Sequence, residues 1–130
     1  MVHEFEVYTS GEGMINITDT ISEALDKIGI QEGICLVFVP HTTAGITINE
    51  GMDEAVASDI MAGLEASIAD LPYQHNEGNS VAHIKSSLIG SSVTVPISGG
   101  KLYLGPWQAI FLCEFDGPRM RKIRVNCVGA

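Results

Sequence analysis

Hydrophobic and polar residues alternate along several short stretches of the chain, a pattern that predicts strands with one buried face. Residues 3–8 and 14–18 alternate in this way on either side of a glycine turn, so we expect them to form a hairpin. The continuous apolar run at residues 34–40 predicts a strand in the interior of a sheet. Further strands are predicted at residues 46–50, 91–97, 101–104, 107–115 and 121–128, with the last two as a second hairpin.

Two longer segments space their apolar residues as a helix does. The first begins near residue 19 and ends at residue 28, where Gly29 closes it. The second covers residues 52–68. Its apolar stripe consists of Val56, Ile60 and Leu64.

A third, short helix is predicted at residues 80–89, with Asn79 as its cap and Gly90 just beyond its end. The residues expected to pack on the body of the protein are Val81, Ile84 and Leu88. His83 points away from that stripe, which fits either a cleft or plain exposure to solvent. Two main helices, one short helix and strands that mostly follow one another predict an α+β fold.

The length of 130 residues predicts a single domain covering residues 1–130. Lys and Arg number 7 against 16 Asp and Glu, which gives a net charge of −9. This charge argues against a nucleic-acid partner, because such proteins carry a basic surface. We also expect no membrane partner, because no apolar run approaches the ~20 residues of a membrane span.

The three cysteines lie in apolar, strand-like runs and form no CxxC pair. The first ten residues lack the basic start and apolar core of a secretion signal. These features together predict reduced thiols that fill the core of a cytoplasmic protein.

Histidines are the first candidates for chemistry. His75 and His83 flank a Gly/Asn/Ser turn, and His41 directly follows the buried strand at residues 34–40. Three histidines and a water would make an open, zinc-type catalytic site. The spacing is not a diagnostic ligand pattern, so surface histidines are an equally plain interpretation.

An anion site is the second candidate. A helix that starts at Asn79 and Ser80 exposes free backbone N–H groups, which suit an anion. Lys85 and Arg119 could add positive charge. The alternatives are a solvated Lys85 and an Arg119 paired with Asp116 in a turn.

Two carboxylates complete the candidates. Glu50 precedes the second helix, and Glu114 closes an otherwise apolar run. A buried Glu114 would need a partner or a metal. We expect desolvation to raise its pKa, which would suit general acid/base work.

Four stretches of the chain resemble the motifs of one known family, the YjbQ-like family, which is named for secondary thiamine-phosphate synthase activity. They are HTTAGITINE (41–50), NSVAHIKSSLIGSS (79–92), VPISGGKLYLGPWQ (95–108) and EFDGPR (114–119). The resemblance implies a β-sandwich of about seven mostly antiparallel strands in two sheets. It also implies a homotrimer.

The resemblance implies roles for residues at motif positions as well. His41, His75 and His83 would bind a divalent metal, zinc or magnesium, with His75 the least secure of the three. Glu50, Lys85 and Arg119 would be catalytic. The substrate-binding residues would be Thr42, Thr43, Asn79 and Ser80.

The implied function is a small-molecule enzyme that acts on phosphorylated metabolites with the assistance of a metal. Thiamine-phosphate synthesis joins a pyrimidine diphosphate to a thiazole phosphate and releases pyrophosphate, a step that cationic groups would assist. The word "secondary" implies a transferase with this step as a side activity, and a metal-dependent hydrolase of another phosphorylated metabolite is equally compatible. The alternative is a non-catalytic trimeric module that binds a metal or a small ligand.

Overall fold

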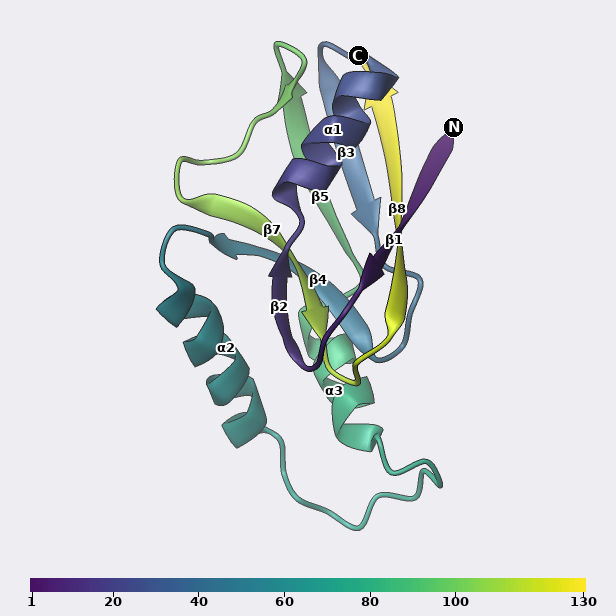
Figure 1. The fold of residues 1–130 in the computed structure, drawn as a ribbon, viewed down its shortest axis with the longest axis vertical. Coiled ribbons are helices and arrows are strands. Elements are labelled where there is room, and N and C mark those ends of the chain that lie inside the picture. The colour runs from purple at the N-terminus through teal and green to yellow at the C-terminus, as the bar shows by residue number, and fades with distance from the viewer.

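The computed structural model describes all 130 residues, and its eight strands form two antiparallel sheets (Figure 1). The strands are β1 Val2–Tyr8, β2 Gly13–Asn16, β3 Gly33–Phe38, β4 Ala44–Glu50, β5 Ser92–Ser98, β6 Lys101–Leu102, β7 Gln108–Glu114 and β8 Met120–Gly129. The helices are α1 Thr18–Ile28, α2 Glu54–Ser67 and α3 Ser80–Ile89. The predicted α+β fold is confirmed, with eight strands where about seven were expected.

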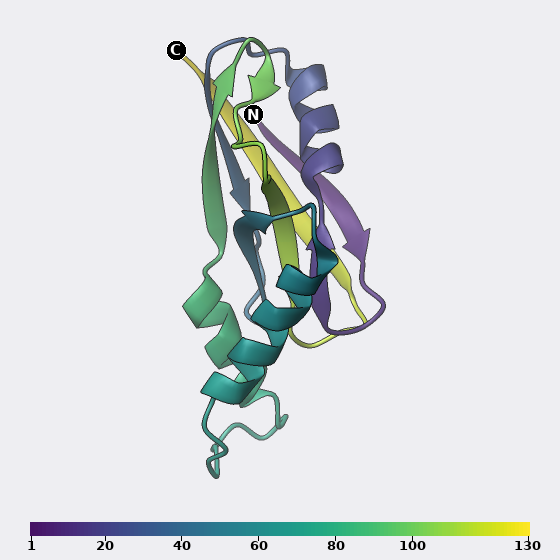
Figure 2. The ribbon, with the colours of Figure 1, turned by 90° about the vertical axis from the view of Figure 1, so that its left-hand side faces the viewer.

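One sheet has five strands in the order β1-β8-β3-β5-β6, and the other has three in the order β2-β7-β4. Their facing side chains and the inner face of α1 form one hydrophobic core. Ile21 and Leu25 of α1 are buried in it together with Val37, Ile110 and Ile123 from the strands. Both termini lie at the end of the molecule that carries α1, and α3 lies at the opposite end (Figures 1 and 2).

Both predicted hairpins are wrong. β1 pairs with β8, where Phe5 lies opposite Ile123, and β2 pairs with β7, where Met14 lies opposite Cys113. The turns after β1 and after β7 therefore carry the chain from one sheet to the other. Alternation specifies which face of a strand is buried, but it does not specify the neighbouring strand.

β3 lies inside its sheet, between β8 and β5, as the apolar run predicted. Its two faces differ, however. Cys35 and Val37 are fully buried, whereas Ile34, Leu36 and Phe38 are 47%, 36% and 36% exposed. The outer face of the five-stranded sheet thus carries an uncovered row of apolar side chains, which soluble proteins usually keep small.

α2 begins after Asp53, whose carboxylate accepts a hydrogen bond of 3.0 Å from the Ala55 amide. None of its residues is fully buried, including those of the predicted stripe. The helix lies beside the three-stranded sheet (Figures 1 and 2), and its Met61 and Leu64 pack against a small cluster that includes Cys113 and Phe115. None of the three helices is long and apolar enough to cross a membrane.

α3 covers the predicted residues and ends at Gly90, but the face it buries was predicted wrongly. The buried residues are Ala82, Lys85 and Ser86, whereas Leu88 is 62% exposed. The small Ala82 allows the helix to approach Phe115, and the Ser86 hydroxyl donates a 2.7 Å hydrogen bond to the Ala44 carbonyl. The hydrogen bond to β4 therefore determines which face of α3 is buried, and the predicted stripe of Val81, Ile84 and Leu88 does not.

Candidate functional site

A polar cavity of about 220 Å³ lies at the end of the molecule where α3 begins. Its residues come from the loop before β4, the segment that leads into α3, α3 itself, and the turn between β7 and β8. They are Thr42, Thr43, His75, Glu77, Asn79, His83 and Arg119. No hydrophobic side chain lines this polar cavity, so it suits a charged or strongly polar ligand.

Two of the predicted histidines meet in the polar cavity. The rings of His75 and His83 are 5.2 Å apart between centroids and cross at 84°, in an edge-to-face arrangement. His75 lies in the irregular segment before α3, and His83 lies in the first turns of that helix. The packing of one ring against the other fixes the orientation of both toward the same space.

His41 lies outside the polar cavity. Its Nε2 accepts a 2.8 Å hydrogen bond from the backbone amide of Lys122 in β8. Burial lowers the pKa of His41 below its usual value, and the nearby Arg121 guanidinium lowers it further. The ring is therefore neutral near pH 7, with one nitrogen engaged by the backbone and the proton on the other.

Arg119 and Asp116 hold one wall of the polar cavity together, and Asn79 joins them. Arg119 donates hydrogen bonds to the Asp116 carboxylate (2.8 Å) and to the Asp116 carbonyl (2.6 Å). The Asn79 side-chain amide donates to the same carboxylate at 2.8 Å. These contacts, that of Asn79 first, hold the pKa of Asp116 below its usual range. The pairing of Arg119 with Asp116 is confirmed, and the guanidinium is still half-exposed.

Asn79 does not cap α3 with its side chain, contrary to the prediction. The bond to Asp116 uses the amide nitrogen, which leaves Oδ1 pointing elsewhere. That oxygen is buried and has no hydrogen-bond partner in the protein. A buried acceptor without a donor costs free energy, so an N–H or O–H group that reached Asn79 Oδ1 would recover this cost.

A buried ion pair supports the polar cavity from behind. The Glu114 carboxylate is fully buried and accepts hydrogen bonds from Arg121 Nε (2.8 Å), Arg121 Nη2, the Thr9 hydroxyl (2.8 Å) and the Asp116 amide (3.1 Å). Arg121 Nη2 also donates to Thr43 Oγ1 at 3.0 Å. The Thr43 hydroxyl is thereby held in place, with its own hydrogen free for a ligand.

The predicted rise in the pKa of Glu114 is wrong. Burial does raise the pKa, but the hydrogen bonds from Arg121, Thr9 and the Asp116 amide outweigh burial, and the net pKa lies below the usual value. Glu114 is thus a structural carboxylate that is charged near pH 7, and its partner is an arginine rather than a metal. A carboxylate of this kind is a poor general acid.

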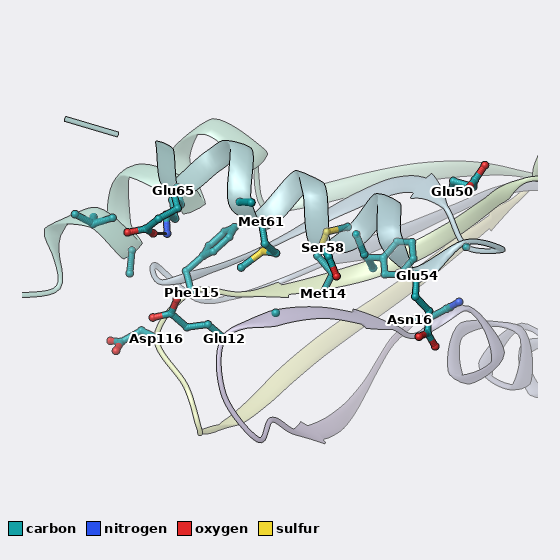
Figure 3. A pocket seen from close by; sticks show the side chains of 18 of the residues that line it. Glu12, Met14, Asn16, Glu50, Glu54, Ser58, Met61, Glu65, Phe115 and Asp116 are labelled. Atoms are coloured by element: carbon teal, nitrogen blue, oxygen red, sulfur yellow. Dashed lines mark hydrogen bonds and ion pairs between the residues drawn. The ribbon is translucent and has the colours of Figure 1, made fainter. Parts of the chain in front are cut away.

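A larger groove of about 1040 Å³ adjoins the polar cavity. Asn79 lines both spaces, whereas Asp116 lines the groove alone. It lies between α2, α3 and the three-stranded sheet. Figure 3 shows Met14 and Met61 in its middle, Glu12, Phe115 and Asp116 toward one end, and Asn16, Glu50 and Glu54 toward the other. The groove has an apolar floor and a strongly acidic rim.

Lys85 and Glu50 belong to this groove and not to the polar cavity. Lys85 is 3% exposed and forms an ion pair with Glu65 of α2, so the interpretation as a solvated lysine is wrong. Glu50 lies at the end of β4. The structure therefore separates the three predicted catalytic residues, because only Arg119 lines the polar cavity.

Four other predicted residues can be placed. Thr42, Thr43 and Asn79 line the polar cavity, whereas Ser80 lines neither space. Arg121 was not among the predicted residues, although its position gave a signal. Arg121 shares a strand face with the buried Ile123 and Val125, so a charge there had to be buried and paired.

The chain holds no group of three histidine, cysteine, aspartate or glutamate side chains placed to bind a metal ion. His75 and His83 lie together, and His41 is engaged elsewhere. Catalytic zinc sites commonly use three protein ligands. The donor set within one chain falls short of that number.

Comparison with known proteins places this architecture in one family. The family model described as "UPF0047 protein YjbQ-like" matches residues 3–130. A UPF0047 protein of Methanocaldococcus jannaschii is 46% identical over 131 residues, covering 99% of this chain and 95% of the relative. The UPF0047 protein YugU of Bacillus subtilis is 42% identical over 126 residues, covering 93% of each chain.

Solved structures agree with this result. A crystal structure of a YjbQ/UPF0047 protein from Clostridium acetobutylicum has a TM-score of 0.92 at 48% identity, and the match covers 97% of this chain and 99% of that one. A crystal structure of a hypothetical protein from Aeropyrum pernix has a TM-score of 0.92 at 34% identity, covering 100% and 99% of the two chains. The chain described here therefore belongs to the YjbQ-like family, UPF0047.

Proposed function

We propose that the protein is a small-molecule enzyme of the cytoplasm that binds the phosphate of a phosphorylated metabolite in the polar cavity. The main support is that Arg119, His75 and His83 line one cavity, which has no hydrophobic side chain in its wall. Arginine binds phosphate oxygens with two parallel hydrogen bonds, and histidine can donate to them or pass on a proton. Asp116 holds Arg119 in position for this task.

The groove would take the organic part of the same molecule. Its floor of methionine and phenylalanine side chains offers apolar contact, and its rim of carboxylates favours a body that is positively charged or rich in hydrogen-bond donors. Asn79 Oδ1, at the boundary between the polar cavity and the groove, would accept a hydrogen bond from such a donor. A ligand with a phosphate at one end and an N–H or O–H group beside it matches both spaces.

The reaction proposed is transfer or hydrolysis at that phosphorylated group, as in secondary thiamine-phosphate synthase, which the family resemblance suggested. Arg119 would stabilise the charge that develops on a departing diphosphate. His83, backed by His75, would hold or deliver the proton that the leaving oxygen needs. Lys85 and Glu50 would act through the groove, where they contact the organic part.

The binding of a divalent metal also remains a proposal, and it requires a ligand from outside this chain. His75 and His83 could supply two ligands for zinc or magnesium, and at least one further ligand would have to come from outside this chain. No step of the reaction is assigned to a metal. Elemental analysis of the purified protein tests the proposal, and a stoichiometric metal would indicate a site completed between subunits.

Replacing Arg119 with alanine is expected to weaken the binding of pyrophosphate by roughly 10–100-fold, because a charge-assisted contact is lost. His83→Ala should weaken it by a smaller factor. Isothermal titration calorimetry measures both. The control is Lys101→Ala, which removes an exposed cation of β6 that lines neither space and should leave binding unchanged. If the wild type, Arg119→Ala and His83→Ala bind pyrophosphate with equal affinity, the polar cavity is not the phosphate site.

A turnover assay distinguishes an enzyme from the alternative, a non-catalytic module that binds a metal or a small ligand. The assay follows pyrophosphate release from a pyrimidine diphosphate in the presence of a thiazole phosphate. An enzyme should lose this release in His83→Ala while its fold and assembly stay intact. Release that is absent in the wild type, together with dissociation or melting in His83→Ala, would instead favour the module.

The homotrimer also remains a proposal. Its support is the apolar row on the outer face of β3, formed by Ile34, Leu36 and Phe38. Burial of these side chains against neighbouring subunits would contribute about 25 cal/mol for each Å² of apolar surface removed from water.

Phe38→Glu is expected to convert a trimer into monomers, because it would bury a charge in that interface. Light scattering after size-exclusion chromatography gives the mass. Met52→Glu is the matched control, since it places the same charge on an exposed apolar residue outside the row. A wild-type monomer, or a Phe38→Glu variant that stays trimeric, would contradict this assembly.

A further inference from the structure

Two of the three cysteines face each other across a pair of neighbouring strands. Cys35 of β3 and Cys127 of β8 are directly opposite partners in the antiparallel ladder. Both point to the core side of the sheet. Cys35 lies next to the buried Val37 on that face, and Cys127 packs against the same core cluster. Cys113 has no such partner, because Met14 and Gly45 lie opposite it in the other sheet.

This placement meets the geometric requirement of a disulfide bond. Directly opposite residues of an antiparallel pair have Cα atoms about 4.5–5.5 Å apart. Disulfides join Cα atoms about 4.4–6.8 Å apart, so the backbone need not move for the bond to form. The thiols are also close enough to interact. Burial raises the pKa of Cys35 to about 12, and a hydrogen bond with Cys127 acts in the same direction.

The two thiols differ in access. Cys35 is fully buried, whereas Cys127 is partly exposed and lies near the end of β8. A small oxidant from solvent therefore reaches Cys127 first. Cys35 is then the nearest thiol that can attack the oxidised sulfur.

We propose that Cys35 and Cys127 form an oxidative modification site, a cross-strand dithiol that a peroxide closes into a disulfide. Hydrogen peroxide oxidises the Cys127 thiol to a sulfenic acid and is itself reduced to water. The Cys35 sulfur then attacks the Cys127 sulfur, the S–S bond forms as the S–O bond breaks, and the departing hydroxyl leaves as water with the Cys35 proton. In total, two thiols and one peroxide give one disulfide and two waters.

The bridge would add a covalent link between two neighbouring strands of the five-stranded sheet. β3 leads to Thr42 and Thr43, and β8 follows directly after Arg119, so the bonded strands both lead to the polar cavity. The bridge itself lies far along both strands from these residues. Oxidation is therefore expected to stiffen the five-stranded sheet and leave pyrophosphate binding unchanged.

The test treats the full-length protein with hydrogen peroxide. The expected results are the loss of two hydrogen atoms in the intact mass, a peptide pair joining Cys35 to Cys127, and a Tm that rises by roughly 5–15 °C because the closed loop is long. Dithiothreitol should reverse all three changes.

Matched variants keep the test decisive. Cys127→Ser should remove the bridge and the Tm rise, whereas Cys113→Ala should retain both, because its thiol belongs to the other sheet. If Cys127→Ser fails to fold, the peptide map of the wild type still decides. Oxidation to sulfinic acid without a cross-link, or a bridge that includes Cys113, would overturn the proposal.

Discussion

Replacing Arg121 with methionine is expected to destabilise the protein by about 3–5 kcal/mol, because it leaves the Glu114 carboxylate buried without its cation. Glu114 is 0% exposed and Arg121 is 3% exposed, so water cannot replace the lost partner. The change also frees the Thr43 side chain from its contact with Arg121. Urea unfolding followed by fluorescence of the single tryptophan measures the loss.

Two comparisons separate this explanation from a mere loss of packing. In the double variant Glu114→Leu with Arg121→Met, no uncompensated charge remains, so much of the lost stability should return. Arg124→Met removes an arginine that is 46% exposed and pairs with Glu4 on the surface, and it should change stability far less. A single Arg121→Met variant as stable as the wild type would contradict a structural role for the pair.

The same pair predicts how stability depends on pH. The pKa of Glu114 in the folded protein lies below its ordinary value near 4.5, so the unfolded chain takes up a proton first as the pH falls. Stability from the pair is therefore complete above that value and is lost as the pH falls through the lower pKa of the folded state. Glu114→Gln should flatten this part of the curve of unfolding free energy against pH. If Glu114→Gln leaves the acidic part of this curve unchanged, Glu114 is not the group that causes the loss of stability.

The elements of the fold were largely readable from the sequence, and their partners were not. The predicted helix at residues 80–89 matches α3, and the apolar run around β3 does lie inside a sheet. Local spacing reports the face that a strand buries. The pairing of β1 with β8 joins the two ends of the chain, and no local pattern encodes contacts of that range.

The candidate site was readable in part for the same reason. The sequence predicted His41, His75 and His83 as one set of metal ligands and Lys85 and Arg119 as the cations of an anion site. In the structure His75, His83 and Arg119 line the same cavity, and His41 and Lys85 lie outside it. Lys85 was predicted either as a cation of an anion site or as a solvated lysine. The rotation of α3, in which Ser86 contacts Ala44, buries Lys85 instead. Asn79 Oδ1 is unpaired because the Asn79 side chain bonds to Asp116 and does not cap α3. The contact with Asp116 is tertiary, so the sequence did not reveal it.

Gly45 is the second position where a large effect is expected. A Cβ atom at this residue of β4 would lie 2.8 Å from the Gly90 carbonyl oxygen and 3.1 Å from Cγ2 of Ile89. The end of α3 is held at this point by the hydrogen bond from the Ile46 amide to the Gly90 carbonyl, at 3.0 Å. Any side chain at Gly45 must therefore push α3 away from the sheet.

We expect Gly45→Val to destabilise the protein by about 2–4 kcal/mol, through overpacking and the loss of this hydrogen bond. Because α3 carries His83 and directly follows Asn79, pyrophosphate binding should weaken in the same variant. Urea unfolding and calorimetry measure the two effects. Gly63→Ala is the control, since a Cβ there meets nothing within 4 Å, and an alanine inside α2 should stabilise by roughly 0.5–1 kcal/mol. A Gly45→Val variant that keeps full stability but loses binding would mean that α3 is held by other contacts and that Gly45 serves the ligand directly.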